Sequence, residues 1–453
     1  QSCGARWWQT LPIHPVDRYH SPYAAASAFA GFDGLISPDL LVRDGLLKPA
    51  EARPGKRLPD RRVDYDAALA HRRALLALAY ERFDADDAFD AFCDREAHWL
   101  DDWTLYAALE EAHRGKPWRK WPRPLRLRQA KPLAQAREGL AHRRRYHAFV
   151  QHLFHRQWAE LRAVCAACGV ALMGDVPIFV GLDSCDVWSH RELFDLDREG
   201  APKVISGVPP DDFSATGQLW EHPHYRWPAH QKTGYDWWVR RMRRTLDLYD
   251  SARVDHFLGF LRCWAIPYGD KTAKRGKWRK TPGRELLEAL HEGLGAMPFV
   301  VEDLGLLTPE AAALRDDFGL PGMRILQFAF GGDDSYHAPH RWTTHCLAYT
   351  GTHDNDTLRG WLATLAPDQR RRALRYTGGP VTNAADDLLR LLLAGPQNLA
   401  IAPAQDLLGL GGAHRMNRPG SKNGNWAWRM PPGSWKPARA RKQLAQNRLF
   451  GRC

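Results

Sequence analysis

The stretch Ser251-Ala252-Arg253-Val254-Asp255-His256 reads as a short buried strand that ends in charged residues. Two further short acidic motifs lie far along the chain, and each follows an apolar, β-branched run. They are Glu302-Asp303 and His353-Asp354-Asn355. In a β/α barrel the carboxyl ends of the parallel strands meet at one face, where side chains from several strands can act together. The three motifs therefore favour a barrel in which carboxylates from several strands lie close together at one face.

Strand-like apolar runs recur along the whole chain, at residues 6–13, 170–175, 251–256, 299–303, 323–328, 347–352 and 398–403. Helical patterns lie between several of them, at 235–249, 284–292, 309–317 and 356–365. This alternation predicts an α/β fold of the (β/α)8 TIM-barrel type. Such a barrel has eight strands, so we expect the first βα unit to be missing before Gln1, with an open sheet as the alternative.

We expect a single catalytic barrel domain over residues 1–453, with two departures from the strand–helix alternation. Residues 32–140 have mostly helical spacing and predict a helical insertion. Residues 179–235 are rich in Gly, Pro, Asp and Trp and predict a long loop that covers the substrate, because loops of such length are usually functional.

The composition is that of an ordinary globular chain, with 453 residues, 44% hydrophobic residues and 26% charged residues. A net charge of +12 allows a nucleic-acid partner, but the basic residues are spread along the chain and favour a solvated surface.

No apolar run is long enough to span a bilayer. The eight cysteines are scattered rather than arranged as a disulfide framework, so we expect a cytoplasmic protein without nucleic-acid or membrane partners.

Arg253 and Asp255 are two residues apart on a strand and therefore point to the same face. The guanidinium favours the ionised carboxylate, and an ionised aspartate at a strand end suits a nucleophile. A structural ion pair in the barrel interior explains the same spacing.

Glu302 ends an apolar run, and apolar walls raise the pKa of a carboxyl group. Such a group can donate a proton and later retrieve one, although Glu302 could instead cap the helix near Thr308. Asp354 follows a glycine-containing turn and could oppose positive charge, but taken alone its position favours an N-cap for the helix that starts near Asp356. Asp175 is a fourth acidic residue at a strand end.

The sequence contains one possible metal-binding pair and no cofactor-binding motif. His222-Pro223-His224 has the spacing of a metal pair but follows no strand. The chain has no Walker loop and no glycine-rich dinucleotide motif after a strand. We therefore expect neither a metal nor a cofactor.

Together these motifs resemble the 4-alpha-glucanotransferase family, also called amylomaltase or disproportionating enzyme, over nearly the whole chain. The resemblance rests on stretches that occur in a fixed order: Trp8-Gln9-Thr10-Leu11-Pro12, Ser21-Pro22-Tyr23, Gly174-Asp175-Val176-Pro177, Gly207-Val208-Pro209-Pro210-Asp211, Gly217-Gln218-Leu219-Trp220, Arg253-Val254-Asp255-His256, Glu302-Asp303-Leu304-Gly305, Thr350-Gly351-Thr352-His353-Asp354-Asn355 and Gly424-Asn425-Trp426.

The resemblance implies transfer of α-1,4-glucan segments by a retaining mechanism, with Asp255 as nucleophile, Glu302 as acid/base and Asp354 as transition-state stabiliser. It also implies substrate-binding residues, which are Tyr23, Asp175, Asp211, Gln218, Trp220, Arg253, His256 and His353. The expected partners are α-1,4-glucans and maltooligosaccharides, and the expected state is a monomer or homodimer. Two alternatives stay open: an α-glucan hydrolase, and an inactive glucan-binding fragment if a barrel strand is missing.

Overall fold

The computed structural model describes residues 2–54, 58–210, 214–305, 308–332, 335–378, 384–421 and 423–453. Its main sheet has seven strands, all parallel, in the order β1-β2-β5-β8-β9-β10-β11. Their bounds are β1 Trp7–Gln9, β2 Ala171–Val176, β5 Ser251–Val254, β8 Phe299–Val301, β9 Gly322–Ile325, β10 Cys346–Tyr349 and β11 Leu399–Ile401. The seven strands predicted from the sequence are these seven, and the curled sheet with its helices is an α/β fold of the TIM-barrel type.

The central strands are buried along their whole length, as parallel strands covered on both faces should be. Every residue of β5, β8, β9 and β10 is buried. Their apolar side chains form the sheet's core, while Asp175, Arg253 and Arg324 are buried charged residues within the strands. Charged side chains at such positions require partners, and the first two find them in the site described below.

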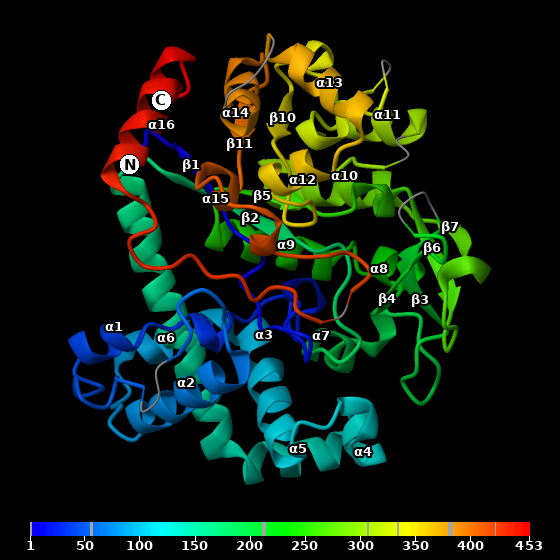
Figure 1. Cartoon of the computed structure of the whole chain (residues 1–453). Coiled ribbons are helices and arrows are strands. Elements are labelled where there is room, and N and C mark those ends of the chain that lie inside the picture. Colours follow the sequence, from blue (N-terminus) through cyan, green and yellow to red (C-terminus); the bar gives the residue numbers. More distant parts are fainter. Residues whose placement is uncertain are drawn as a thin grey trace.

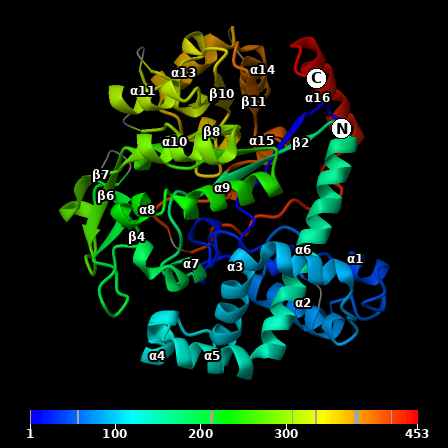
Figure 2. The same ribbon diagram turned by 180° about the vertical axis from the view of Figure 1, so that it is seen from behind.

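Helices cover the sheet and also form a separate group below it (Figure 1). Between and after the later strands lie α9 Asp236–Leu248, α10 Gly283–Leu294, α11 Pro309–Asp317, α12 Leu358–Thr364, α13 Pro367–Tyr376, α14 Ala384–Ala394, α15 Ala404–Leu407 and α16 Pro437–Leu449. The separate group contains α1 Pro38–Arg43, α2 Tyr65–Tyr80, α3 Asp87–Ala112, α4 Arg123–Arg126, α5 Ala130–Gly139 and α6 Ala141–Ala167. Figure 2 shows α6 running from this group back to the sheet, where β2 follows it.

A continuous apolar core joins the helical group to the sheet. Phe149 and Phe154 of α6 belong to the same buried cluster as Leu105 of α3 and Val254 of β5. The helical group is therefore packed against the barrel through a shared apolar core.

The interval 179–235, which the sequence predicts as a long loop, contains regular structure. It holds α7 Cys185–Ser189, α8 Trp227–Lys232, β3 Val204–Val208 and β4 Gln218–Pro223. A second, antiparallel sheet of order β4-β3-β6-β7 includes β6 Arg262–Pro267 and β7 Lys277–Lys280. The sequence pattern did not reveal β3, which pairs with β4 on one side and with β6, from a more distant part of the chain, on the other; the preference of a segment for a strand depends on such neighbours.

Candidate active site

The carboxylates of Asp255 and Glu302 stand next to each other at the ends of neighbouring strands. β5 and β8 pair Val254 with Val301, and each carboxylate residue directly follows its paired valine. Pairing continues past the strand ends, since the Glu302 N–H donates to the Val254 carbonyl at 2.9 Å. Neighbouring strands lie ~4.8 Å apart and paired residues point the same way, so the two carboxyl groups face the same space.

Arg253 holds two aspartates in that space. Its guanidinium donates to both carboxylate oxygens of Asp175 at 2.8 Å and to Oδ1 of Asp255 at 2.8 Å. The side chains of Arg253 and Asp175 are only 4% and 1% exposed, whereas that of Asp255 is 25% exposed. The buried pair thus fixes the arginine, and the arginine stabilises negative charge on an aspartate that a ligand can still reach. The ion pair that the spacing predicts is therefore present in the barrel interior, and it also contacts an accessible carboxylate.

Glu302 is held by backbone donors on both of its carboxyl oxygens. The N–H of His256 donates to Oε2 at 2.8 Å, and the N–H of Leu304 donates to Oε1 at 2.9 Å. Burial raises the pKa of Glu302 to about 8; the cation of Arg253 opposes this change and the charge of Asp255 adds to it. A carboxyl group with such a pKa can both give and take a proton near neutral pH.

Tyr23 and His353 close the site from two other segments. The Tyr23 hydroxyl, in a short helical turn at Pro22–Ala24, donates to Asp175 at 2.7 Å and lies 3.3 Å from Nδ1 of His353. The two rings stack with centroids 4.9 Å apart. His353 in turn places Nε2 3.4 Å from Oδ1 of Asp354, whose side chain is 46% exposed. The segment after β10 therefore brings Asp354 to the same cluster.

Among the other predicted binding residues, His256 and Trp220 join the cluster directly. His256 follows Asp255 in a left-handed conformation, with φ of 49°, and its ring meets Trp220 of β4 edge-on at 4.9 Å. Gln218 lies two residues before Trp220 and accepts its indole N–H at 3.3 Å. Asp211, also predicted to bind substrate, lies outside the described residues.

Neither carboxylate serves as the helix cap that the sequence allowed. The N-cap of α11 is Thr308, whose hydroxyl accepts the N–H of Ala311. The N-cap of α12 is Thr357, whose hydroxyl accepts the N–H of Gly360. Glu302 instead accepts the backbone N–H groups of His256 and Leu304, and Asp354 accepts a side-chain amide.

Three residues of the cluster were missed by the sequence reasoning. Asn417 donates to Oδ1 of Asp354 at 2.6 Å, and Arg415 donates to the Asp354 backbone carbonyl at 2.5 Å. The Trp426 ring lies 5.6 Å from Tyr23 and 5.7 Å from His353. Trp426 belongs to a stretch that carries the family resemblance, so a signal for it was present, whereas nothing in the sequence pattern marked Asn417 or Arg415.

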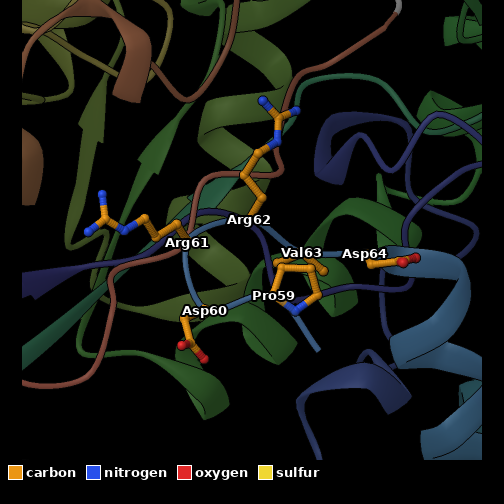
Figure 3. A pocket seen from close by; sticks show the side chains of 6 residues that line it. All are labelled: Pro59, Asp60, Arg61, Arg62, Val63 and Asp64. Carbon is orange, nitrogen blue, oxygen red and sulfur yellow. The ribbon is translucent and has the colours of Figure 1, made fainter. Parts of the chain in front are cut away.

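A groove of about 610 Å³ lies beside residues 59–64 (Figure 3). This segment is joined to the chain around Trp426, since the Val63 N–H donates to the Ala427 carbonyl at 2.7 Å. Figure 3 shows Arg61 and Asp64 extending from it in opposite directions. The groove is therefore lined by a segment that is hydrogen-bonded to the residue after Trp426.

Two negative findings apply to the described part of the chain. Its histidine, cysteine and acidic side chains form no group of three or more that could hold a metal ion. Its helices include none with the length and apolar character that crossing a membrane requires.

Comparison with known proteins gives consistent matches over nearly the whole chain. The family model described as 4-alpha-glucanotransferase matches residues 1–434. The 4-alpha-glucanotransferase of Thermus thermophilus is 44% identical over 452 residues, which cover 96% of this chain and 90% of the relative. That of Aquifex aeolicus is 39% identical, with 95% and 89% covered. An amylomaltase from Streptococcus agalactiae, solved in complex with acarbose, superposes with a TM-score of 0.96 at 34% identity and covers 100% of this chain and 93% of that one.

Proposed function

Because the chain belongs to the 4-alpha-glucanotransferase family, we propose that the cluster of Asp255, Glu302 and Asp354 transfers α-1,4-glucan segments from a donor to an acceptor. The donor is a maltooligosaccharide or longer α-1,4-glucan, and the acceptor is the 4-hydroxyl of another glucan or of glucose. The proposal needs neither a metal nor a nucleotide.

The observation that carries the proposal is the contrast between two adjacent carboxyl groups. Arg253 stabilises negative charge on Asp255 at 2.8 Å, while burial raises the pKa of Glu302 to about 8. Paired titratable groups with such different environments are typical of an acid and a nucleophile. Their places after paired residues of neighbouring strands bring the two carboxyl groups close together, and retaining enzymes use two such groups on either side of the scissile bond.

In the first step the Asp255 carboxylate attacks the anomeric carbon of the donor sugar. The bond to the leaving glycosidic oxygen breaks, and protonated Glu302 gives its proton to that oxygen. The shortened glucan leaves with a new 4-hydroxyl group, and the transferred segment remains as a glycosyl ester of Asp255. Glu302 is then a carboxylate.

In the second step the acceptor replaces the departed chain. Glu302 removes the proton of the acceptor 4-hydroxyl, the oxygen attacks the anomeric carbon, and the ester bond to Asp255 breaks. Two displacements at the same carbon restore the α-configuration. Glu302 is protonated again, so the enzyme returns to its starting state.

The remaining predicted residues are proposed to hold the sugar at the reacting carbon. Asp354 opposes the positive charge that develops on the sugar ring. Asp175, Arg253, Tyr23 and His353 bind its hydroxyl groups; the buried ion pair and the Tyr23 hydrogen bond support a fixed arrangement of these groups.

Transfer requires that an acceptor sugar replaces the leaving chain faster than water does. We propose that Trp220, Gln218 and His256, together with Asp211 outside the described residues, cover the acceptor side. An aromatic side chain can stack on a sugar ring, and a covered site excludes water. The contact of Trp220 with His256 supports this placement, because His256 also holds Glu302 through its N–H.

The proposal treats residues 1–453 as one catalytic barrel domain, with 32–140 as its helical insertion and 179–235 as its substrate cover. We further propose that a glucan chain continues along the groove beside residues 59–64 (Figure 3). A cytoplasmic location and a monomeric or homodimeric state are also proposed; light scattering of the purified protein measures the second.

Incubation with maltotriose tests the function. Transfer yields glucose together with oligosaccharides longer than maltotriose, and chromatography of the products detects both. Release of only glucose and maltose would identify a hydrolase instead. Binding of maltotriose without any product would identify an inactive glucan-binding protein.

A further inference from the structure

Asp354 is fixed differently from the other two carboxylates of the cluster. Asp255 and Glu302 directly follow paired strand residues, whereas Asp354 lies in a turn several residues beyond β10, which ends at Tyr349. Its side chain is also 46% exposed. The register of the sheet does not reach this position, so another part of the molecule has to hold the carboxylate in place.

Residues 415–417, which we name the Arg415–Asn417 clamp, hold it from a distant part of the sequence. The Asn417 side-chain amide donates to Oδ1 of Asp354 at 2.6 Å, and the Arg415 guanidinium donates to the Asp354 carbonyl at 2.5 Å. The Asn417 N–H donates to the His353 carbonyl at 3.1 Å. Arg415 also donates from Nε to the Asn417 carbonyl at 2.7 Å, which braces the clamp itself. Backbone and side chain of Asp354 are therefore both engaged.

The clamp is part of the segment that crosses between the barrel and the helical group after α15 (Figure 1). The Trp426 N–H donates to the Met416 carbonyl at 2.8 Å, and the Trp426 ring lies 5.6 Å from Tyr23. One segment thus sets both the position of Asp354 and an aromatic wall of the same site.

We infer that Asn417 is a positioning residue for Asp354. The amide of Asn417 and Nε2 of His353 both approach Oδ1, so Oδ2 is the oxygen left to face the sugar. An N–H donor on a carboxylate holds its orientation before the substrate arrives, which lowers the cost of reorganisation during the reaction. Arg415 supports this arrangement through the backbone of Asp354.

The inference rests on the proposed role of Asp354. The test distinguishes a failure of the role inferred for Asn417 from a failure of the role proposed for Asp354. The variants are Asn417→Asp, Asn417→Ala and Asp354→Asn, with Asn423→Asp as the control. Asn423 is an exposed asparagine of the same segment, so its replacement makes the same chemical change away from the clamp. For each variant kcat and KM with maltotriose are measured, together with the melting temperature.

We expect kcat to fall about 10-fold for Asn417→Ala, because one hydrogen bond to a charged group is lost. We expect a fall of about 100-fold for Asn417→Asp, since an acceptor then faces the Asp354 carboxylate in place of a donor. KM should change little, as expected for an interaction that matters mainly in the transition state. Lowering the pH should partly restore Asn417→Asp relative to wild type, because the introduced carboxyl group becomes a donor when protonated.

A purely structural role predicts the opposite order. Asn417→Asp preserves the side-chain shape and would then be the milder change, losses would follow the melting temperature, and pH would not rescue activity. Any of these results overturns the inference if Asp354→Asn is inactive. Full activity of Asp354→Asn would instead refute the proposed role of Asp354 itself, and equal losses in Asn423→Asp would show that the effect is not specific to the clamp.

Discussion

The replacement Glu302→Gln tests the electrostatics of the site through the stability of the whole protein. The folded protein raises the pKa of Glu302 from 4.5 to about 8 because it buries the carboxyl group beside Asp255. Between these two pH values the folded state keeps a proton that the unfolded state has lost. The contribution of Glu302 to stability is therefore most favourable below pH 4.5 and declines as the pH rises toward about 8. Glutamine cannot ionise, so the variant lacks this decline.

The size of the effect follows from the pKa change. Raising a carboxyl pKa over this range costs the ionised form about 5 kcal/mol. Glu302 is only partly buried, and screening by water reduces the expected cost to ~3 kcal/mol. Two backbone N–H groups donate to Oε1 and Oε2 of Glu302. The glutamine side chain of the variant has only one oxygen, so one of these donors loses its acceptor at a cost of ~1–3 kcal/mol. That cost does not depend on pH. The quantity to follow is therefore how the difference in stability between variant and wild type changes with pH.

Melting temperatures of both proteins, measured from pH 5 to pH 9, provide the assay. The variant should gain stability relative to wild type as the pH rises, with the gain levelling off above about pH 8. In parallel, wild-type kcat/KM for maltotriose should fall tenfold per pH unit above that value, since the leaving sugar needs a protonated acid. Formation of the glycosyl ester from α-glucosyl fluoride, whose leaving group needs no proton, should not fall. A stability difference that stays constant over this pH range would refute the raised pKa.

Three further outcomes follow from single contacts. Arg253→Met should destabilise the fold by ~3–5 kcal/mol, because Asp175, whose side chain is 1% exposed, loses its cationic partner; urea unfolding measures this, and a loss below 1 kcal/mol would contradict it. Gly174→Ala should cost ~1–3 kcal/mol, because a Cβ there would lie 2.4 Å from the ring of Tyr249; an unchanged melting temperature would show that the ring can move aside. Trp220→Ala should raise the share of hydrolysis products from maltotriose at least severalfold, and an unchanged product ratio would remove this side chain from the proposed acceptor cover.

Local pattern was enough to predict the strands of the main sheet. A buried parallel strand is mostly apolar, so β8 is visible in the sequence without knowledge of its neighbours. The stretch of β5 is also predicted as a strand, although it contains Ser251 and Arg253. Strand ends follow from the same runs, which is why Asp255 and Glu302 could be placed at one face of the barrel. The second sheet gave no such signal; β3 lies in its interior, between β4 and the more distant strand β6.

By itself the sequence determined which residue types stand at the strand ends, since burial of the preceding run is a local property. It also determined the family, through short motifs that occur in a fixed order along the chain. Only the tertiary structure decided how the charges interact: Arg253 reaches Asp175 from the adjacent strand β2, and Asn417 reaches Asp354 from a segment with no regular pattern. Hydrogen bonds and pKa values depend on distances of a few ångströms between groups far apart in the chain, and the folded chain alone sets those distances.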